Sequence, residues 1–207
     1  GYLPIIAIFL VARVALAEAY VIPSGSMEPT LQVGDRLLVN KLRLGPHIPF
    51  TAVSLPGYAQ PKRNDIVVFV SPPQVPAIRI TPGEVTPTLI KRIVGLPGDT
   101  LMMRNGRLLV DGTAAPERNT DYVLPAAVAE QPQPLFSWQR RLEVRGSRFG
   151  PPPASASLHD WGPLVVPAGM FFMLGDNRDN SVDSRYYGPV PRANLRGTPM
   201  FIYYSYD

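Results

Sequence analysis

The sequence of 207 residues contains no cysteine. Structural disulfides, thiol nucleophiles and cysteine-based zinc sites are therefore excluded. Long helices are also disfavoured, because 25 prolines and 17 glycines are spread along the chain and proline breaks helix interiors and central strands. The chain is nevertheless 45% hydrophobic, and it is long enough to bury one sizeable core. This composition predicts an irregular, loop-rich β protein.

The sequence also has no large excess of one sign of charge, because the formal net charge is only +4. Basic residues occur as scattered pairs, at 62–63, 91–92 and 140–141, rather than as an extended patch of the kind that binds nucleic acid. We therefore expect no nucleic-acid partner. A mild positive charge is equally compatible with anionic lipid head groups.

No apolar run is long enough to span a bilayer, which takes about 20 residues. Residues 1–12 (GYLPIIAIFLVA) carry no charge, and Arg13 and Glu18 then interrupt the apolar pattern. We interpret residues 1–20 as an apolar helix that forms the outer end of a membrane anchor. Two alternatives stay open. The small residues at 15–17 fit a cleaved signal peptide, and an amphipathic helix docked on its own domain has a similar pattern.

From residue 31 onward the apolar residues follow strand patterns. The run at 63–70 is rich in β-branched residues and predicts a strand that is buried on both faces. Residues 100–112 predict a hairpin, because Asn105 and Gly106 suit a type I′ turn. Further strands are expected within 34–41, 88–99, 163–177 and 199–207.

Residues 113–160 interrupt this pattern. They include the segments EQPQP and GPPPASAS, show little periodicity, and contain the aromatic residues Phe136 and Trp138. We predict an irregular inserted lobe here. It divides a mainly antiparallel β core into a first part, residues 21–112, and a second part, residues 161–207.

The stretch IPSGSMEPTL places Ser24 and Ser26 on either side of Gly25 and raises the question of a serine nucleophile. A Ser-His-Asp triad needs a histidine held against the serine. His47 lies in a proline-flanked loop and His159 in the irregular region, and neither context favours catalysis. The Ser-x-x-Lys signature also fails, because neither serine has a lysine three residues later.

A neutral lysine is the other general base available to a serine, provided that burial or a nearby positive charge lowers its pKa. Lys91 lies in the predicted strand TLIKRIVG, where Leu89 and Ile93 share its face and Arg92 points to the other face. Lys91 is therefore a candidate base with apolar neighbours, and Arg92 needs a separate partner. Position alone equally permits an edge-strand lysine that extends to water.

The segment GDNRDNSVDSRYYGPVP, residues 175–191, is dense in short polar side chains and arginines. A solvated polar loop is the simplest interpretation. The alternation of carboxylates with arginines favours instead a hydrogen-bonded corner with paired charges. Calcium binding is a third possibility, but the spacing differs from the EF-hand loop and the arginines would oppose a cation.

Together these blocks resemble the type I signal peptidases of bacteria, which are membrane-anchored serine proteases with a Ser-Lys dyad. The resemblance implies a mainly β fold, with an antiparallel, barrel-like catalytic core of the signal-peptidase type behind the N-terminal apolar helix. It does not extend to residues 113–160. The matching blocks, in the family's order, are IPSGSMEPTL, GDRLLVNK, PKRNDIVVF, IKRIVGLPGD and GDNRDNSVDSRYYGPVP.

The resemblance implies that Ser26 is the nucleophile and Lys91 the general base. Ser24, with the backbone N–H of Ser26, would stabilise the oxyanion, and Ser181 would orient Lys91. The supporting charges would be Asp183 with Arg185 and Asp176 with Arg92. The pocket for the small residues of the substrate would be lined by Ile22, Pro23, Met27, Leu31 and Leu89.

One position departs from the family's pattern. The turn before DIVVF usually holds glycine, whereas this chain has Asn64. Asparagine tolerates positive φ angles better than most residues, so we expect the turn to be retained.

The implied reaction is the endoproteolytic removal of signal peptides from exported preproteins at small-x-small (Ala-x-Ala) sites, without a cofactor or metal. The resemblance further implies a monomer at the bacterial inner membrane, with the catalytic part on the outer side. Apolar segments 48–50 and 53–55 are expected to dip into the lipid.

Two other functions were weighed against this one. A self-cleaving Ser-Lys protease of the repressor type carries a DNA-binding head, whereas an apolar segment leads this chain. An inactive, membrane-tethered β-rich binding module is disfavoured because Ser26, Lys91 and Ser181 are all present.

Overall fold

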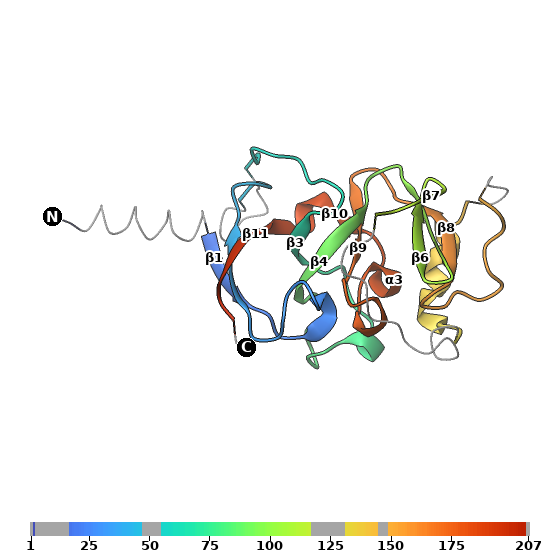
Figure 1. The fold of residues 1–207 in the computed structure, drawn as a ribbon, viewed down its shortest axis with the longest axis horizontal. Coiled ribbons are helices and arrows are strands. Elements are labelled where there is room, and N and C mark those ends of the chain that lie inside the picture. Colours follow the sequence, from blue (N-terminus) through green and yellow to red (C-terminus); the bar gives the residue numbers. More distant parts are fainter. Residues whose placement is uncertain (1, 3–16, 47–54, 117–130, 145–148, 206–207) are drawn as a thin grey trace.

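Two antiparallel sheets form the framework of the part of the chain that the computed structural model describes, residues 2, 17–46, 55–116, 131–144 and 149–205. The larger sheet has seven strands in the order β1-β2-β11-β3-β4-β9-β10, and the smaller has four in the order β7-β6-β5-β8 (Figure 1). Helical turns are short. The expectation of a mainly β, antiparallel fold is therefore confirmed.

Along the chain, strands are interspersed with short helical segments, of which the longest described, Pro134–Arg141, has eight residues. The strands are β1 (Ala17–Val21), β2 (Arg36–Asn40), β3 (Ile66–Val70), β4 (Thr88–Gly95), β5 (Thr100–Arg104), β6 (Arg107–Val110), β7 (Thr113–Ala114), β8 (Trp161–Val165), β9 (Met170–Leu174), β10 (Val190–Pro191) and β11 (Leu195–Tyr204). The helical segments are η1 (Gly25–Met27), η2 (Pro76–Ile78), η3 (Pro134–Arg141), η4 (Arg178–Asn180), α3 (Ser184–Tyr187) and η5 (Arg192–Asn194).

Strand β9, with the sequence MFFML, joins the two halves of the core. Successive side chains of a strand point to opposite faces. Phe171 and Met173 accordingly pack in one cluster with β3 and β4 residues, whereas Phe172 and Leu174 pack in another with the smaller sheet. The Phe172 ring stacks on Trp161, with 5.4 Å between the ring centroids. The side chains of β9 therefore pack in the cores of both sheets, so that the two sheets do not form separate domains.

The predicted elements of the core are present. The middle residues of β3 are all buried, as a strand covered on both faces requires. The β5–β6 hairpin turns at Asn105 and Gly106, whose φ angles are 49° and 75°. Both are positive, which is the condition for the type I′ turn expected from the sequence.

The described part of the inserted segment packs on the catalytic region. Phe136 of η3 is buried and meets the edge of the Tyr186 ring at 4.9 Å between centroids. The indole N–H of Trp138 donates to the backbone carbonyl of Arg185 at 2.9 Å. This lobe is therefore irregular, as expected, but its described residues contact the main core directly.

The N-terminal helix was predicted to continue to residue 20, and this boundary is wrong. Ala17–Val21 is strand β1, which pairs with β2 along its whole length. Tyr20 and Val21 are good strand residues, and β2 supplies the backbone partner that periodicity alone does not reveal. Residues 3–16 lie outside the described residues. Among those described, no helix has the length and apolar character needed to cross a bilayer.

The fold predicts that Trp161→Ala strongly destabilises the protein, because the indole is fully buried between the sheets. The loss should be about 3–5 kcal/mol of unfolding free energy, measured by urea denaturation followed by circular dichroism. Val33→Ala, at a position that is half exposed, serves as the control and should change the value by no more than about 0.5 kcal/mol. Equal effects of both substitutions would contradict the proposed core.

Candidate active site

The η1 turn presents Ser26 at the end of β1. Backbone bonds from Ile22 to Asp35 and from Gly34 to Ile22, both 2.9 Å, hold the entry to this turn. Ile22 and Met27, on either side of Ser26 in sequence, are buried in one apolar cluster with β2 and β3 residues. The turn therefore has little freedom, and the hydroxyl of Ser26 is fixed at the surface of that cluster.

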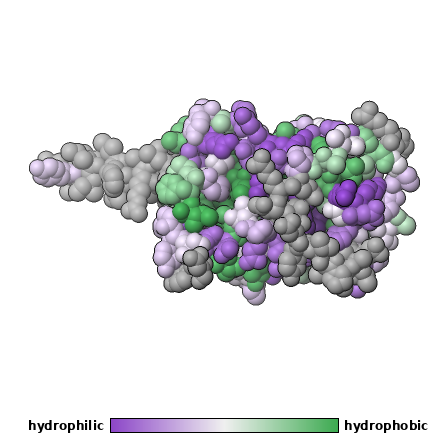
Figure 2. All heavy atoms as spheres, viewed as in Figure 1, coloured by the Kyte–Doolittle hydropathy of each residue, from purple (hydrophilic) through white to green (hydrophobic). Residues whose placement is uncertain are grey.

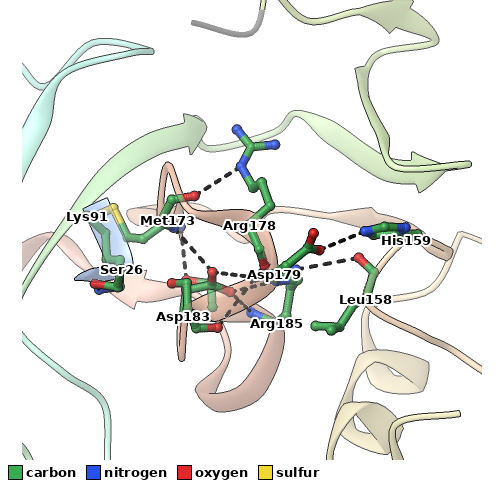
Figure 3. Close-up of polar contacts among 12 residues, drawn as sticks. Ser26, Lys91, Leu158, His159, Met173, Arg178, Asp179, Asp183 and Arg185 are labelled. Atoms are coloured by element: carbon green, nitrogen blue, oxygen red, sulfur yellow. Dashed lines mark hydrogen bonds and ion pairs between the residues drawn. The ribbon is translucent and has the colours of Figure 1, made fainter. Parts of the chain in front are cut away.

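Lys91 lies in the middle of β4, opposite Val67 of β3, and β9 pairs on the other side of β4. Its side chain is only 3% exposed, which excludes the alternative of an edge-strand lysine extending to water. The Nζ atom lies 2.6 Å from the Oγ atom of Ser26 (Figure 3). Residues 65 positions apart in sequence thus meet directly.

Burial lowers the pKa of Lys91 to about 8. The nearby carboxylates of Asp183 and Asp176 act in the opposite direction, and the Arg185 guanidinium adds a smaller lowering effect. Desolvation is the largest of these effects, because removal from water disfavours the charged form of the amine. Lys91 can therefore be neutral close to physiological pH, as a general base must be.

The serines predicted to assist the dyad lie close to it but differ in their contacts. The hydroxyl of Ser24 donates to Ser26 Oγ at 3.5 Å. Ser181 is buried, and its Oγ atom has no hydrogen-bond partner among the described residues. The expected hydrogen bond to Lys91 is thus absent from the structure, although Ser181 and Lys91 line the same cavity.

A glycine allows the polar segment after β9 to approach the nucleophile. A Cβ atom at Gly175 would overlap both the Oγ of Ser181 and the backbone oxygen of Ser26. Asn177 then bonds the η1 turn twice, through its backbone N–H to the Ser26 carbonyl (3.2 Å) and its side-chain amide to the Gly25 carbonyl (3.1 Å). These contacts fix the two segments relative to each other.

Asp176 and Arg92 form the predicted ion pair. Arg92 donates through Nε and Nη2 to the two carboxylate oxygens at 2.7 and 2.6 Å, and Thr30 donates to the same carboxylate at 2.5 Å. Arg92 also donates to the backbone carbonyl of Asn64 at 2.9 Å. Asn64 has a φ of 72°, so the turn expected to survive without glycine is present.

Asp183 and Arg185 form a second bidentate pair, at 2.9 and 2.8 Å, in which both side chains are fully buried. Burial alone would raise the pKa of Asp183, but the Arg185 guanidinium outweighs this and holds the pKa below its ordinary value. Asp183 also accepts a bond from the backbone N–H of Gly175 at 3.2 Å, and Arg185 donates to the carbonyl of Arg178. The pair thus braces the whole polar segment.

The sequence analysis missed one contact of this segment. The Nε2 atom of His159 lies 2.7 Å from the carboxylate of Asp179. Figure 3 shows this contact on the side away from Ser26. His159 was considered only as a catalytic base, and no sequence signal connects it with Asp179. Its contact with a carboxylate of the 175–191 segment makes it a link between the inserted lobe and the active site. His47 lies outside the described residues.

Each aspartate carboxylate of the 175–191 segment contacts a basic side chain. Asp176 and Asp183 pair with arginines, and Asp179 contacts His159. Within the described residues, no three histidine, aspartate or glutamate side chains gather in a way that could hold a metal ion. The corner of paired charges is therefore the interpretation that the geometry supports, rather than a solvated loop or a calcium site.

A cavity of about 300 Å³ opens beside the dyad, and Leu89 is one of its lining residues. The other residues predicted to line the substrate pocket lie elsewhere. Pro23 is exposed, and three of the set belong to the buried cluster beneath the η1 turn. Those three residues are Ile22, Met27 and Leu31.

Comparison with known proteins gives a consistent picture. The family described as signal peptidase, peptidase S26, matches residues 2–204. A signal peptidase I of Pseudomonas aeruginosa is 35% identical over 220 aligned residues, covering 100% of this chain and 71% of that protein. A signal peptidase I of Leptolyngbya laminosa is 35% identical over 185 residues, covering 89% and 68% respectively. A solved signal peptidase I of Enterococcus faecalis covers 67% of this chain and 96% of its own, at 28% identity and a TM-score of 0.38.

Breaking the Asp183–Arg185 pair should destabilise the fold, because the unpaired guanidinium would remain fully buried. We expect Asp183→Asn to lower the unfolding free energy by about 3–5 kcal/mol, measured by urea denaturation at neutral pH. The matched control is Glu18→Gln. Glu18 contacts Lys41 at 2.7 Å but is 45% exposed, so its loss should cost no more than about 1 kcal/mol. A cost as small for Asp183→Asn would show that the buried pair is not a structural brace.

Proposed function

Because this chain belongs to the signal peptidase (peptidase S26) family, we propose that it is a serine endopeptidase that removes signal peptides from exported preproteins, with Ser26 as nucleophile and Lys91 as general base. The observation that carries the assignment is the 2.6 Å contact between Lys91 Nζ and Ser26 Oγ in a place where the lysine is buried. A neutral lysine at that distance can take the proton of the attacking hydroxyl.

The first half of the reaction forms an ester on Ser26. The Oγ atom attacks the carbonyl carbon of the scissile bond while its proton passes to neutral Lys91. The carbonyl oxygen becomes an oxyanion, for which the Ser24 hydroxyl and the Ser26 backbone N–H are the proposed donors. The 3.5 Å separation of the two serine hydroxyls supports this role, and one such preorganised donor is worth about 3–4 kcal/mol of transition-state stabilisation.

The second half releases both products. When the tetrahedral intermediate collapses, the C–N bond breaks and the Lys91 ammonium gives its proton to the leaving amine, which is the new N-terminus of the mature protein. Water then attacks the ester carbonyl, and Lys91 accepts a proton from that water. Lys91 returns the proton to Ser26 Oγ as the ester bond breaks, so the signal peptide leaves with a free carboxyl group and the dyad is restored.

The remaining roles are assigned by position. We assign Ser181 to the orientation of Lys91, because its buried hydroxyl lines the same cavity and is left without another partner among the described residues. The two bidentate pairs brace the segment that carries it. We assign selection of small side chains to the apolar cluster that contains Met27 of the η1 turn, because Ile22 and Met27 flank Ser26 in sequence and pack there with Leu31.

A membrane location on the outer side of the bacterial inner membrane, with the enzyme acting as a monomer, completes the proposal. It is supported by an apolar surface at the end of the molecule where β1 and β11 lie (Figure 2). Exposed apolar residues that gather at one end of a molecule are typical of an interaction site. Of the segments 48–50 and 53–55, expected to enter lipid, only Leu55 lies within the described residues, and it is half exposed. The exposed apolar residues at this end include Val21, Met200, Phe201, Ile202, Tyr203 and Tyr204.

A cleavage assay tests the dyad. The wild type should cut a preprotein carrying an Ala-x-Ala site, Ser26→Ala should abolish cleavage, and Lys91→Ala should lower kcat/KM by roughly 10²–10⁴-fold, the usual contribution of a general base. Lys62→Ala, at an exposed lysine, is the control and should cleave like the wild type. Undiminished cleavage by Lys91→Ala would rule out the dyad.

The pH profile tests the state of Lys91. Only the neutral lysine accepts a proton, so kcat/KM should rise about tenfold per pH unit at acid pH and level off above about 8, the value to which burial lowers the pKa of Lys91. The same rise of kcat/KM with pH, the acid limb of the profile, should persist in His159→Gln. A limb that disappears in His159→Gln would instead make that histidine the base.

A further inference from the structure

The connection between β3 and β4, residues 71–87, folds back beside the dyad as a fixed structure, here called the β3–β4 arm. Its backbone continues the pairing of the two strands, with bonds from Ser71 to Pro87 (2.9 Å) and from Gln74 to Val85 (2.8 Å). The Arg79 side chain closes the arm on the Gln74 carbonyl at 2.9 Å. In Figure 1 the arm follows β3 and carries the turn η2.

The arm forms one wall of the cavity beside the dyad. Ile78 and Ile80 line the cavity from this side, while Val182 and Tyr186 line it from the segment after β9. Ile80 is 71% exposed although it is apolar, so it stands at the rim without a partner from the described core. The volume, about 300 Å³, leaves room for a large side chain.

The faces to which the β4 side chains point indicate which part of a substrate enters this cavity. Ile90 packs with the cluster beneath Ser26, the cluster proposed to select the small residues before the scissile bond. Leu89 and Lys91 point to the opposite face and line the cavity. The proton held by Lys91 must reach the leaving nitrogen, so that nitrogen and the residue that carries it have to lie on the cavity side of Ser26.

We propose that the β3–β4 arm forms the subsite for the first residue of the mature protein, and that Ile78 and Ile80 make this enzyme favour an apolar side chain there. The inference rests on the proposed peptidase function and extends it from the signal-peptide side of the cut to the product side. The cavity also contains Asp179, but its carboxylate is engaged by His159. The amide of Gln74, another polar lining residue, is engaged by Ser71. Ile78, Ile80 and Val182 supply apolar surface on which an apolar side chain can be buried.

Matched preproteins test the inference. Two substrates share an Ala-x-Ala site and differ only in the residue after the cut, leucine in one and serine in the other. The wild type should show a kcat/KM at least about tenfold higher for leucine, because leucine carries an isopropyl group where serine has a hydroxyl, and even one methylene in a hydrophobic pocket is worth about tenfold. Ile80→Ser should reduce the ratio to about threefold or less, and Ile78→Ala should reduce it similarly.

Two controls separate the inference from the function on which it rests. Val85→Ser changes an exposed apolar residue of the same arm that does not line the cavity, and it should keep the tenfold ratio. Discrimination between alanine and leucine before the cut should be the same in the wild type and in Ile80→Ser.

The inference alone is overturned if the wild type cleaves both substrates with no preference for leucine after the cut. It is also overturned if Ile80→Ser shows the same preference for leucine as the wild type. A change in alanine selection in Ile80→Ser also overturns it, since the cavity would then belong to the signal-peptide side. Absence of cleavage of every substrate overturns the proposed function and the inference together.

Discussion

The structure depends on the burial of one amino group. Lys91 is placed inside a sheet, where its ammonium form loses hydration, and the resulting fall in its pKa to about 8 suits a side chain that is normally a cation to the role of base that we propose. Burial of this kind requires neighbours on both sides of the strand. β3 and β9 provide them, and the η1 turn covers the end of the side chain with the hydroxyl that it contacts.

The surrounding charges are arranged so that burial prevails. Asp176 and Asp183 would each stabilise an ammonium ion at Lys91, and they do raise its pKa. Each of these carboxylates is already held by an arginine in a two-point contact, so much of its field is cancelled before it reaches Lys91. The ion pairs therefore serve the chemistry as well as the fold, because a free carboxylate at either position would favour the charged lysine and weaken the base.

Much of the framework could be predicted from the sequence. The hairpin at Asn105 and Gly106 and the buried strand β3 followed from local turn chemistry and composition, because those features depend on residues close in the chain. Whether Lys91 was buried or exposed could not be decided, since that depends on which strands lie beside β4. The link between His159 and Asp179 and the pairing of Ala17–Val21 with β2 were also missed, because both are made by segments distant in sequence.

The pairing of β3 with β4 sets both the chemistry and the selectivity that we propose. In the observed register Lys91 lies opposite Val67, with Lys91 facing the cavity and Ile90 facing the cluster beneath Ser26. A shift of one residue would exchange the two faces of the strand and point Arg92, rather than Lys91, toward Ser26. The bond from Arg92 to the Asn64 carbonyl and its pair with Asp176 oppose such a shift. The contacts of Arg92 thus help to keep Lys91 in place.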